Sequence, residues 1–173
     1  MHNKKHQLLD FEIDKLTNSI ENVLTGDSFA TVVLPLSVGD LKKVNKRNGW
    51  SFDWKSELNY SDRKVFKLTI VNNEEIVQGI ISLSISNDLV YMHLIESAPF
   101  NLGKNKVYVG VSGNLIAFAC KLSFANGTGG YISFRSKTRL IDHYIKALGA
   151  VHIGGHLMMI ETRSALRLIE KYF

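Results

Sequence analysis

The sequence has 173 residues, of which 45% are hydrophobic and 21% are charged. That composition is typical of a globular protein, and the length favours one domain over residues 1–173. No apolar run reaches the roughly 20 residues that span a membrane, so we expect no membrane segment. The N-terminus also lacks the apolar centre of a signal peptide. Together with the single cysteine, Cys120, this favours a cytoplasmic protein without an intrachain disulfide.

Basic residues exceed acidic ones and give a formal net charge of +5. The excess is spread over segments 4–5, 42–47, 104–106 and 135–139. A mildly basic surface suits an anionic ligand such as a nucleotide cofactor or a nucleic acid. Scattered solubilising charge explains any one of these segments equally well. The sequence therefore leaves open a nucleic-acid partner, and it also leaves open a homodimer.

The first part of the chain predicts a helix followed by a strand. Apolar residues at helical spacing predict an amphipathic helix over residues 7–25, packed on the domain and ended by Gly26. Its apolar stripe consists of Leu9, Ile13, Leu16, Ile20 and Val23. A strand is expected over 29–36, with Pro35 at its end or on an edge, and a short basic helix over 40–48.

Three strands joined by tight turns predict an antiparallel meander. They cover residues 65–71, 76–86 and 89–98, and Asn- and Asp-containing turns separate them. A turn and a helix over 107–127 then lead to a short strand at 131–134. A strand, a helix and a strand in this order require a parallel, right-handed crossover.

The last part of the chain predicts two more helices around a hairpin. A helix over 138–148 is capped by Thr138 and ends at Gly149. Short strands at 151–153 and 157–160 follow, and a final helix capped by Thr162 reaches the C-terminus. The predicted fold class is therefore mixed α/β (α+β), with a mostly antiparallel central sheet and helices on both faces.

Small residues form the turn before the central helix, at Gly110, Ser112 and Gly113. The apolar face of that helix consists of Val111, Leu115, Phe118, Ala119 and Leu122. A turn of this kind exposes backbone N–H groups at the positive end of the helix dipole, which favours a phosphate or pyrophosphate. A tight turn without a ligand has the same pattern. In mixed sheets, ligands bind at the carboxyl ends of strands beside helix starts, here at the end of strand 89–98.

Three aromatic residues lie within five positions, at Trp50, Phe52 and Trp54. Aromatic residues this dense outside a clear strand line a pocket or a contact surface, or they anchor a loop on the core. Both interpretations stay open from the sequence.

Glu96 is a candidate catalytic residue. By alternation it shares one face of its strand with Met92, Leu94 and Ala98. A carboxylate on an apolar face is costly to bury unless it is paired or opens on a cleft. It is either a general base that deprotonates an ammonium group or one half of a salt bridge with a nearby Lys or Arg.

Two histidines and a glutamate have a loosely metal-like spacing, at His152, His156 and Glu161. They flank the glycine pair of the predicted hairpin, and no further ligand is evident. We therefore expect no metal site.

The predicted order of elements over about residues 29–161 resembles the fold of the GNAT family, the Gcn5-related N-acetyltransferases that use acetyl-CoA. In that family an Arg/Gln-x-x-Gly-x-Gly/Ala turn opens the central helix and binds the CoA pyrophosphate through backbone N–H groups. Here Gly110 matches the central glycine and Ser112 stands for the final small residue. Val107 departs from Arg or Gln, and Lys106 supplies a charge from next door.

A second motif of the family, Phe-Tyr followed by Gly-Phe at the end of the next helix, is matched in part. Tyr144 and Gly149 fit, whereas His143 and Ala150 depart from it. The resemblance implies that Tyr144 is the general acid for the departing CoA thiolate. Without the resemblance, a structural tyrosine is an equally good interpretation. The family also places a glutamate base near the position of Glu96, sometimes acting through water.

The resemblance implies an acyl-CoA-dependent N-acyltransferase that transfers acetyl from acetyl-CoA directly to a primary amine, with Glu96 as base and Tyr144 as acid. Acetyl-CoA would lie between strands 89–98 and 131–134. The expected cofactor-binding residues are Ser97, Ala98, Lys106, Val109, Gly110, Val111, Ser112, Gly113 and Asn114. The expected residues on the acceptor side are Trp50, Phe52 and Trp54.

Two other functions stay open. A GNAT-fold binding or regulatory protein with little or no catalysis is favoured by the departures at Val107 and Ala150. An acetyltransferase that acts on an amine linked to nucleic acid, such as charged tRNA, is favoured by the net charge. The sequence does not specify the acceptor amine.

Overall fold

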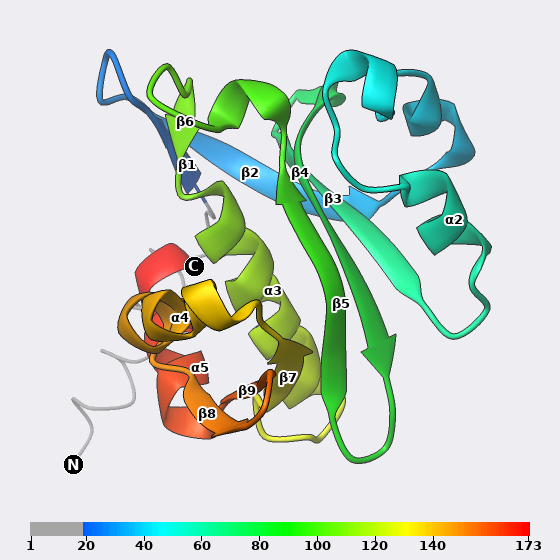
Figure 1. Ribbon diagram of the computed structural model, residues 1–173. Coiled ribbons are helices and arrows are strands. Elements are labelled where there is room, and N and C mark those ends of the chain that lie inside the picture. Colours follow the sequence, from blue (N-terminus) through cyan, green and yellow to red (C-terminus); the bar gives the residue numbers. More distant parts are fainter. Residues whose placement is uncertain (1–18) are drawn as a thin grey trace, which may run out of the picture.

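The structure is a computed structural model that describes residues 19–173. Within these residues nine strands form one sheet in the order β6-β1-β2-β3-β4-β5-β7-β9-β8 (Figure 1). The strands are β1 Ser19–Asn22, β2 Ser28–Pro35, β3 Lys64–Ile70, β4 Asn73–Ile85, β5 Val90–Ser97, β6 Tyr108–Val109, β7 Ile132–Arg135, β8 Val151–Gly154 and β9 Leu157–Ile160. The α-helices are α2 Trp54–Asn59, α3 Val111–Ala125, α4 Ile141–Leu148 and α5 Thr162–Tyr172. Short 3-10 helices are η1 Val38–Lys42, η2 Lys46–Asn48, η3 Pro99–Asn101 and η4 Thr138–Leu140.

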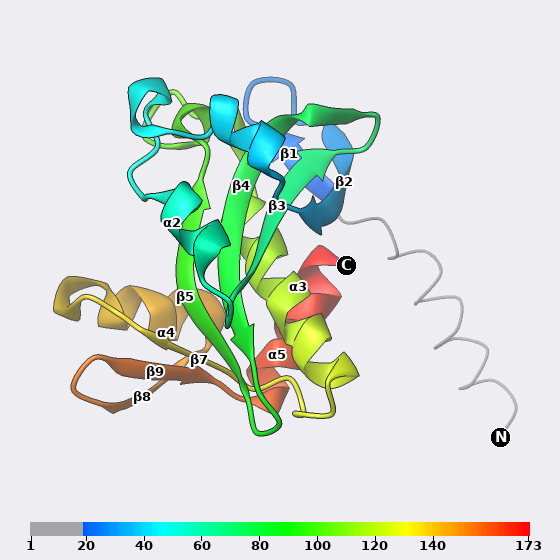
Figure 2. The same ribbon diagram turned by 90° about the vertical axis from the view of Figure 1, so that its right-hand side faces the viewer.

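The pairing of the strands confirms the predicted mixed α/β class. β2, β3, β4 and β5 are antiparallel neighbours, so the meander is present. β5 and β7 are parallel and α3 connects them, as the predicted crossover requires. Figure 2 shows α3 and α5 on one face of the sheet and α2 on the other.

The predicted helix over residues 7–25 is wrong where the structure describes it; residues 7–18 lie outside the described part of the chain. Ser19–Asn22 form β1, which pairs with β2 on one side and with β6 on the other. Residues 23–25 belong to the turn into β2. Ile20 is buried in the core by this pairing, so tertiary packing outweighs the helical spacing of the apolar residues.

The basic helix predicted over 40–48 is instead two 3-10 turns, η1 and η2. Asn45 explains the break between them. Its side chain accepts a hydrogen bond from the Asn48 N–H and donates to the carbonyls of Leu41 and Lys42. An asparagine side chain that bonds the local backbone in this way competes with helical hydrogen bonds.

Three helix starts differ from the prediction. Trp54 begins α2, which the sequence pattern did not predict, and Asp53 caps it. Thr138 is the first residue of η4 and not a cap. Thr162 is the first residue of α5 and not its cap, and its hydroxyl donates to the carbonyl of Gly129, which ties α5 to the turn after α3.

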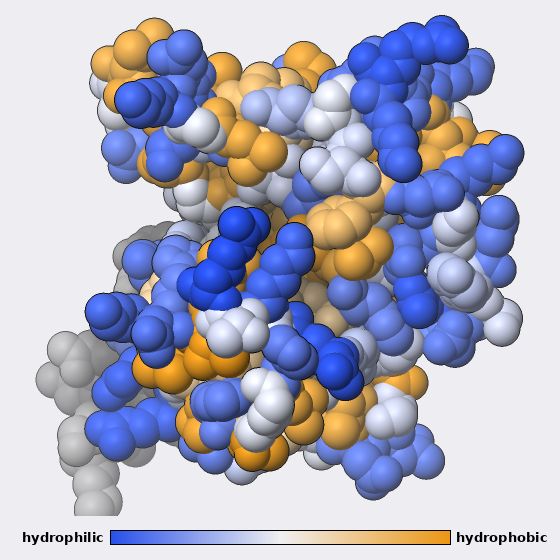
Figure 3. Space-filling model, in the orientation of Figure 1, coloured by the Kyte–Doolittle hydropathy of each residue, from blue (hydrophilic) through white to orange (hydrophobic). Residues whose placement is uncertain are grey.

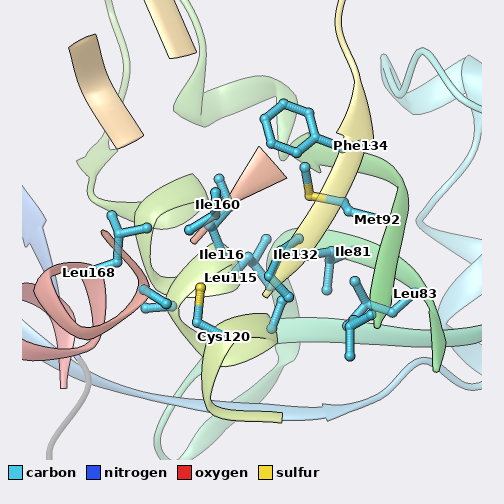
Figure 4. Packing of buried hydrophobic residues seen from close by; sticks show 14 of the residues in the cluster. Ile81, Leu83, Met92, Leu115, Ile116, Cys120, Ile132, Phe134, Ile160 and Leu168 are labelled. Carbon is cyan, nitrogen blue, oxygen red and sulfur yellow. The ribbon is translucent and has the colours of Figure 1, made fainter. Parts of the chain in front are cut away.

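Two hydrophobic clusters lie on the two faces of the sheet. The larger one fills the space between the sheet and α3, with contributions from α5, β7 and β9 (Figure 4). Cys120 is buried in it, and burial raises the pKa of the thiol to about 12, so it stays protonated. The smaller cluster lies under η1 and α2 and includes Trp50, Trp54 and Ala98.

Helices long and apolar enough to cross a membrane are absent from residues 19–173.

Candidate active site

The site begins where two parallel strands separate. β5 pairs with β7 only over Val90–Met92. β5 then continues to Ser97, and no described strand pairs with it on that side. The start of α3 and one side of α4 line the space along this free edge, and Figure 1 shows α3 beside β5. The separation expected between these two strands is therefore present.

The turn before α3 presents a helix N-terminus to this space. Gly110 has a φ of 92°, a left-handed conformation that glycine adopts readily, and it redirects the chain from β6 into α3. The N–H of Asn114 bonds the carbonyl of Gly110 and so closes the first turn. Earlier N–H groups have no partner within a helix, and Gly110–Gly113 line the pocket. This arrangement favours an anion.

Gly113 is required by the packing of α5. A Cβ at this position would overlap the ring of Tyr172. In Figure 1 the C-terminal end of α5 lies beside the start of α3. The last turn of α5 therefore forms one wall of the site, directly beside the N-terminus of α3.

These elements enclose a pocket of about 480 Å³. Lys106 and Lys171 contribute positive charge to its lining, which contains no Asp or Glu side chain. The hydroxyls of Ser97 and Ser112 lie 3.1 Å apart and join β5 to the first turn of α3. Figure 3 shows this face of the molecule, where hydrophilic side chains lie over α4 with hydrophobic surface recessed beside them. Positive charge and free N–H groups together favour an anionic ligand.

Tyr144 on α4 lines the same pocket. Its ring packs edge-on against Phe134 of β7, with the ring centroids 5.2 Å apart. Burial raises the pKa of the Tyr144 hydroxyl, which therefore stays protonated near neutral pH. A protonated hydroxyl beside an anion site can donate a proton to a leaving group.

Comparison with known proteins identifies the fold. No family model matches the sequence, and no curated protein matches it. Among solved structures, mutant forms of the spermidine/spermine N-acetyltransferase SpeG from Vibrio cholerae match with a TM-score of 0.57 and 17% identity, over 79% of this chain and 98% of that chain. Nourseothricin acetyltransferase matches with a TM-score of 0.52 and 15% identity, over 75% of this chain and 97% of that chain. The protein has the GNAT fold.

Two further structural neighbours show how different the functions of proteins with this fold are. A structure of Vibrio cholerae spermidine N-acetyltransferase in complex with CoA and spermine has a TM-score of 0.53 and 18% identity, over 79% of this chain and 98% of that chain. A transcriptional regulator from Bacillus halodurans has a TM-score of 0.51 and 11% identity, over 72% of this chain and 95% of that chain. At these identities the likeness establishes the GNAT fold, and the activity has to be argued from the site.

Most of the cofactor-binding residues expected from the GNAT resemblance line the pocket, namely Ser97, Lys106, Val109, Gly110, Val111, Ser112 and Gly113. Ala98 and Asn114 do not. Ala98 is buried in the smaller cluster, and its N–H bonds the carbonyl of Gln78. The amide of Asn114 donates to the carbonyls of Ser19 and Gly110, so this side chain fixes the start of α3 against β1.

Glu96 lies outside the lining of this pocket, on the α2 face of the sheet. Its carboxylate accepts hydrogen bonds from the N–H of Ser51 at 2.6 Å, the N–H of Phe52 at 3.3 Å and the indole N–H of Trp54 at 2.8 Å. Within residues 19–173 no Lys or Arg forms an ion pair with it, so the salt-bridge interpretation is wrong. Three N–H donors satisfy the buried carboxylate and hold the 50–54 loop on β5.

The alternation expected along β5 fails at one point. Ser82 of β4 pairs with Leu94 and Leu83 pairs with Met92, so a β-bulge leaves one extra residue between them. As a result Met92 packs in the larger cluster with α3, whereas Leu94 packs in the smaller one. The prediction that Met92 shares a face with Glu96 is therefore wrong.

The aromatic loop divides into two kinds of residue. Trp50 and Trp54 are 6% and 1% exposed and belong to the smaller cluster, so they anchor the loop on the core. Phe52 is 39% exposed and stacks edge-on against Trp54. Of the three, only Phe52 has enough free surface to contact a ligand directly.

The histidines of the predicted hairpin bond the backbone. His152 contacts the carbonyl of Gly155 through Nε2, and His156 contacts the carbonyl of Ser136 through Nδ1. In the described part of the chain, no three His, Cys, Asp or Glu side chains are grouped closely enough to hold a metal ion.

The pocket residues that were not predicted from the sequence include Lys171, Tyr172 and His143. Lys171 and Tyr172 reach the pocket from α5, nearly 60 positions after the turn that they flank. No local pattern links such distant segments. His143 also lines the pocket, although the sequence pattern marks it only as a departure from the family motif.

Proposed function

We propose that the protein is a GNAT-type N-acyltransferase that transfers an acetyl group from acetyl-CoA to a primary amine. The observation that carries this proposal is the pocket along the free edge of β5. It combines a helix N-terminus and two lysines with a protonated tyrosine on α4. The Vibrio cholerae enzyme of the same fold that was crystallised with CoA and spermine supports the choice of cofactor.

In this proposal the pyrophosphate binds the backbone N–H groups of Gly110–Gly113. Lys106 and Lys171 supply the positive charge that Val107 lacks at the first position of the family motif. The pantetheine arm then follows the free edge of β5 past Ser97, and the thioester lies near Tyr144. Each of these groups belongs to the pocket lining except Val107.

The chemistry is a direct displacement. The amine nitrogen attacks the thioester carbonyl carbon, the C–S bond breaks, and Tyr144 gives its proton to the departing thiolate. General acid catalysis of this kind depends on a hydroxyl that is protonated at working pH. Tyr144 meets this condition, because burial raises its pKa further above an ordinary value that is already well above neutral.

A thermal-shift titration with acetyl-CoA tests the binding step. Acetyl-CoA should raise the melting temperature by an amount that grows with ligand concentration. Gly110→Glu should abolish the shift because it places a carboxylate and a strained backbone at the anion site. Lys171→Glu should weaken binding by about tenfold, roughly 1.4 kcal/mol. The matched control is Arg167→Glu on the exposed side of α5, which should bind as wild type.

The catalytic step is tested by release of CoA thiol with spermidine, spermine and a panel of other primary amines. Thiol release that depends on both acetyl-CoA and an amine supports the proposal. Absence of any thermal shift at millimolar acetyl-CoA would contradict it.

A second candidate is a GNAT-fold protein that binds CoA and does not catalyse transfer. The apolar Val107, 37% exposed where the family has Arg or Gln, favours it, and a transcriptional regulator shares the fold. This candidate predicts a thermal shift with acetyl-CoA and no thiol release with any amine of the panel.

A further inference from the structure

The extra residue of the β5 bulge is His93. It lies between Met92, the last residue of β5 that pairs with β7, and Leu94. The backbone of His93 is therefore at the point where β5 and β7 separate. Bulges re-aim side chains, and here the bulge turns His93 to the α2 face, where it contacts Ser84 and the ring of Tyr91.

The hydrogen bonds of Ser84 fix the tautomer of His93. The Ser84 hydroxyl donates its single proton to the carbonyl of Asp62 at 2.8 Å. It lies 2.6 Å from Nε2 of His93, and it must accept that hydrogen bond because it has no second proton to give. Nε2 therefore carries the hydrogen. In the neutral ring Nδ1 is then the atom with a free lone pair, and no hydrogen bond to Nδ1 occurs within residues 19–173.

The surroundings keep this ring neutral. Burial lowers the pKa of His93 below its usual 6.5, and the charge of Arg63 lowers it further. Glu57 and Asp62 oppose that shift and do not cancel it. Glu57 is itself engaged by Arg63 and by the hydroxyl of Ser82, which limits its pull on the imidazole. A neutral imidazole with a free nitrogen is suited to accept a proton near neutral pH.

Glu96 is the other candidate for the general base, and its hydrogen bonds differ from those of His93. Three N–H groups donate to its carboxylate, and these bonds fix the 50–54 loop. All three bonds end on the two carboxylate oxygens, so moving this side chain to reach an ammonium would release the loop. His93 can be protonated without losing its bond to Ser84, because the donor nitrogen keeps its hydrogen.

We propose that His93, through Nδ1, is the base that removes a proton from the acceptor ammonium, in place of Glu96. The assignment rests on the proposed acyl transfer. It puts the acid, Tyr144, in the pocket between α3 and α4. It puts the base on the α2 face, on the residue of β5 that follows the last pair with β7.

The proton balance follows from that placement. One proton passes from the ammonium to Nδ1 of His93 and then to solvent. The neutral amine forms a bond to the carbonyl carbon as the C–S bond breaks. Tyr144 protonates the thiolate, and the second proton of the amine restores Tyr144 through water.

The test uses chloroacetyl-CoA, so it needs no knowledge of the natural acceptor. A free nucleophile next to the bound acyl group displaces chloride, and a new N–C bond forms as the C–Cl bond breaks. We expect one adduct per chain on His93, detected by intact mass and peptide mapping, and suppressed by excess CoA. Its rate should fall only below pH 6.5, the usual histidine value, because the ring pKa is lowered.

Two variants test whether the adduct forms on His93 or on another histidine. His93→Gln keeps an amide that can donate to Ser84 and should lose the adduct. His152→Gln, on the exposed strand β8, should keep it. An adduct on another residue, or no adduct while acetyl-CoA still raises the melting temperature, would overturn the assignment of His93 alone. Failure of both CoA and acetyl-CoA to bind would overturn the proposed function, and this assignment with it.

Discussion

The two faces of the sheet bury different kinds of side chain. Against α3 most buried residues are apolar, as Leu115 and Ile132 are, and the buried polar residues of α3, Asn114 and Ser123, are uncharged. Between α2 and the sheet two carboxylates are buried, Glu57 of α2 and Glu96 of β5. Glu57 pairs with Arg63 and accepts from Ser82, and Glu96 accepts three N–H groups.

The two faces therefore stabilise the fold in different ways. The α3 face depends on apolar area and close packing, which are non-directional and tolerate volume-conserving changes. The α2 face depends on matched donors and acceptors, so that loss of one partner leaves the others buried and unsatisfied. In the proposed enzyme the packed face carries the cofactor pocket, and the hydrogen-bonded face carries the groups that meet the acceptor.

Tyr144→Phe should have the largest effect, which is on turnover. It tests whether the residue acts in catalysis or only in packing on the α3 side. The change deletes one hydroxyl and keeps the ring against Phe134. Turnover should fall by about 10²–10⁴-fold, as expected for loss of a general acid, with acetyl-CoA affinity and melting temperature little changed. Tyr60→Phe, at an exposed position after α2, is the control. A loss below tenfold would mean that the thiolate leaves without help from Tyr144.

Leu115→Ala tests the packed face directly. Leu115 is fully buried in the larger cluster, so truncation should lower the free energy of unfolding by about 2–5 kcal/mol in urea titrations. Leu166→Ala, which is 53% exposed on α5, should stay within about 0.5 kcal/mol of wild type. Equal effects of the two changes would contradict the assignment of the core to this face.

Glu96→Gln tests the hydrogen-bonded face. The amide replaces an anionic acceptor and points an NH₂ group towards N–H donors, so the free energy of unfolding should fall by about 1.5–3 kcal/mol. The hydrogen bonds of the 50–54 loop should weaken before the rest of the fold is affected. Faster hydrogen exchange at the amides of Ser51 and Phe52 is expected before any change in α3. Unchanged exchange at these two amides would show that Glu96 does not hold the loop.

The smallest expected effect is on the pH dependence of the free energy of unfolding. His93 has a lower pKa in the folded protein than the usual 6.5, so the unfolded chain binds more protons in the interval between the two values. The contribution of His93 to the free energy of unfolding should therefore be fully present above pH 6.5 and decrease as pH falls through that interval. His93→Gln should flatten this part of the profile of unfolding free energy against pH. An unchanged slope in the variant would assign the pH dependence to other groups.

Periodicity predicted the packed face well and the hydrogen-bonded face poorly. The apolar stripe around Leu115 and the strands of the meander follow from local spacing, because each residue's environment repeats along its own element. The partners of Glu96 come from a loop more than 40 positions earlier, and nothing in the local pattern specifies them. The prediction therefore found the carboxylate and missed what satisfies it.

Two further errors have the same cause. Ile20 fits a helical stripe, and its strand is defined only by pairing with β2 and β6. His93 was not considered because strict alternation along β5 leaves no place for an extra residue. In the pocket, the small residues of the turn at Gly110 were recognisable because a helix N-terminus is a local feature, whereas Lys171 is brought there by tertiary structure alone.

The position of Tyr172 has a practical consequence. Its ring lies against Gly113, at the start of the helix that lines the pocket, and Phe173 follows it immediately. A label attached at position 173 therefore lies one residue from a pocket wall. A solvent-sensitive fluorophore placed there should change its emission when an anionic ligand enters. It would give an optical readout of binding that needs neither an acceptor amine nor a chemical reaction.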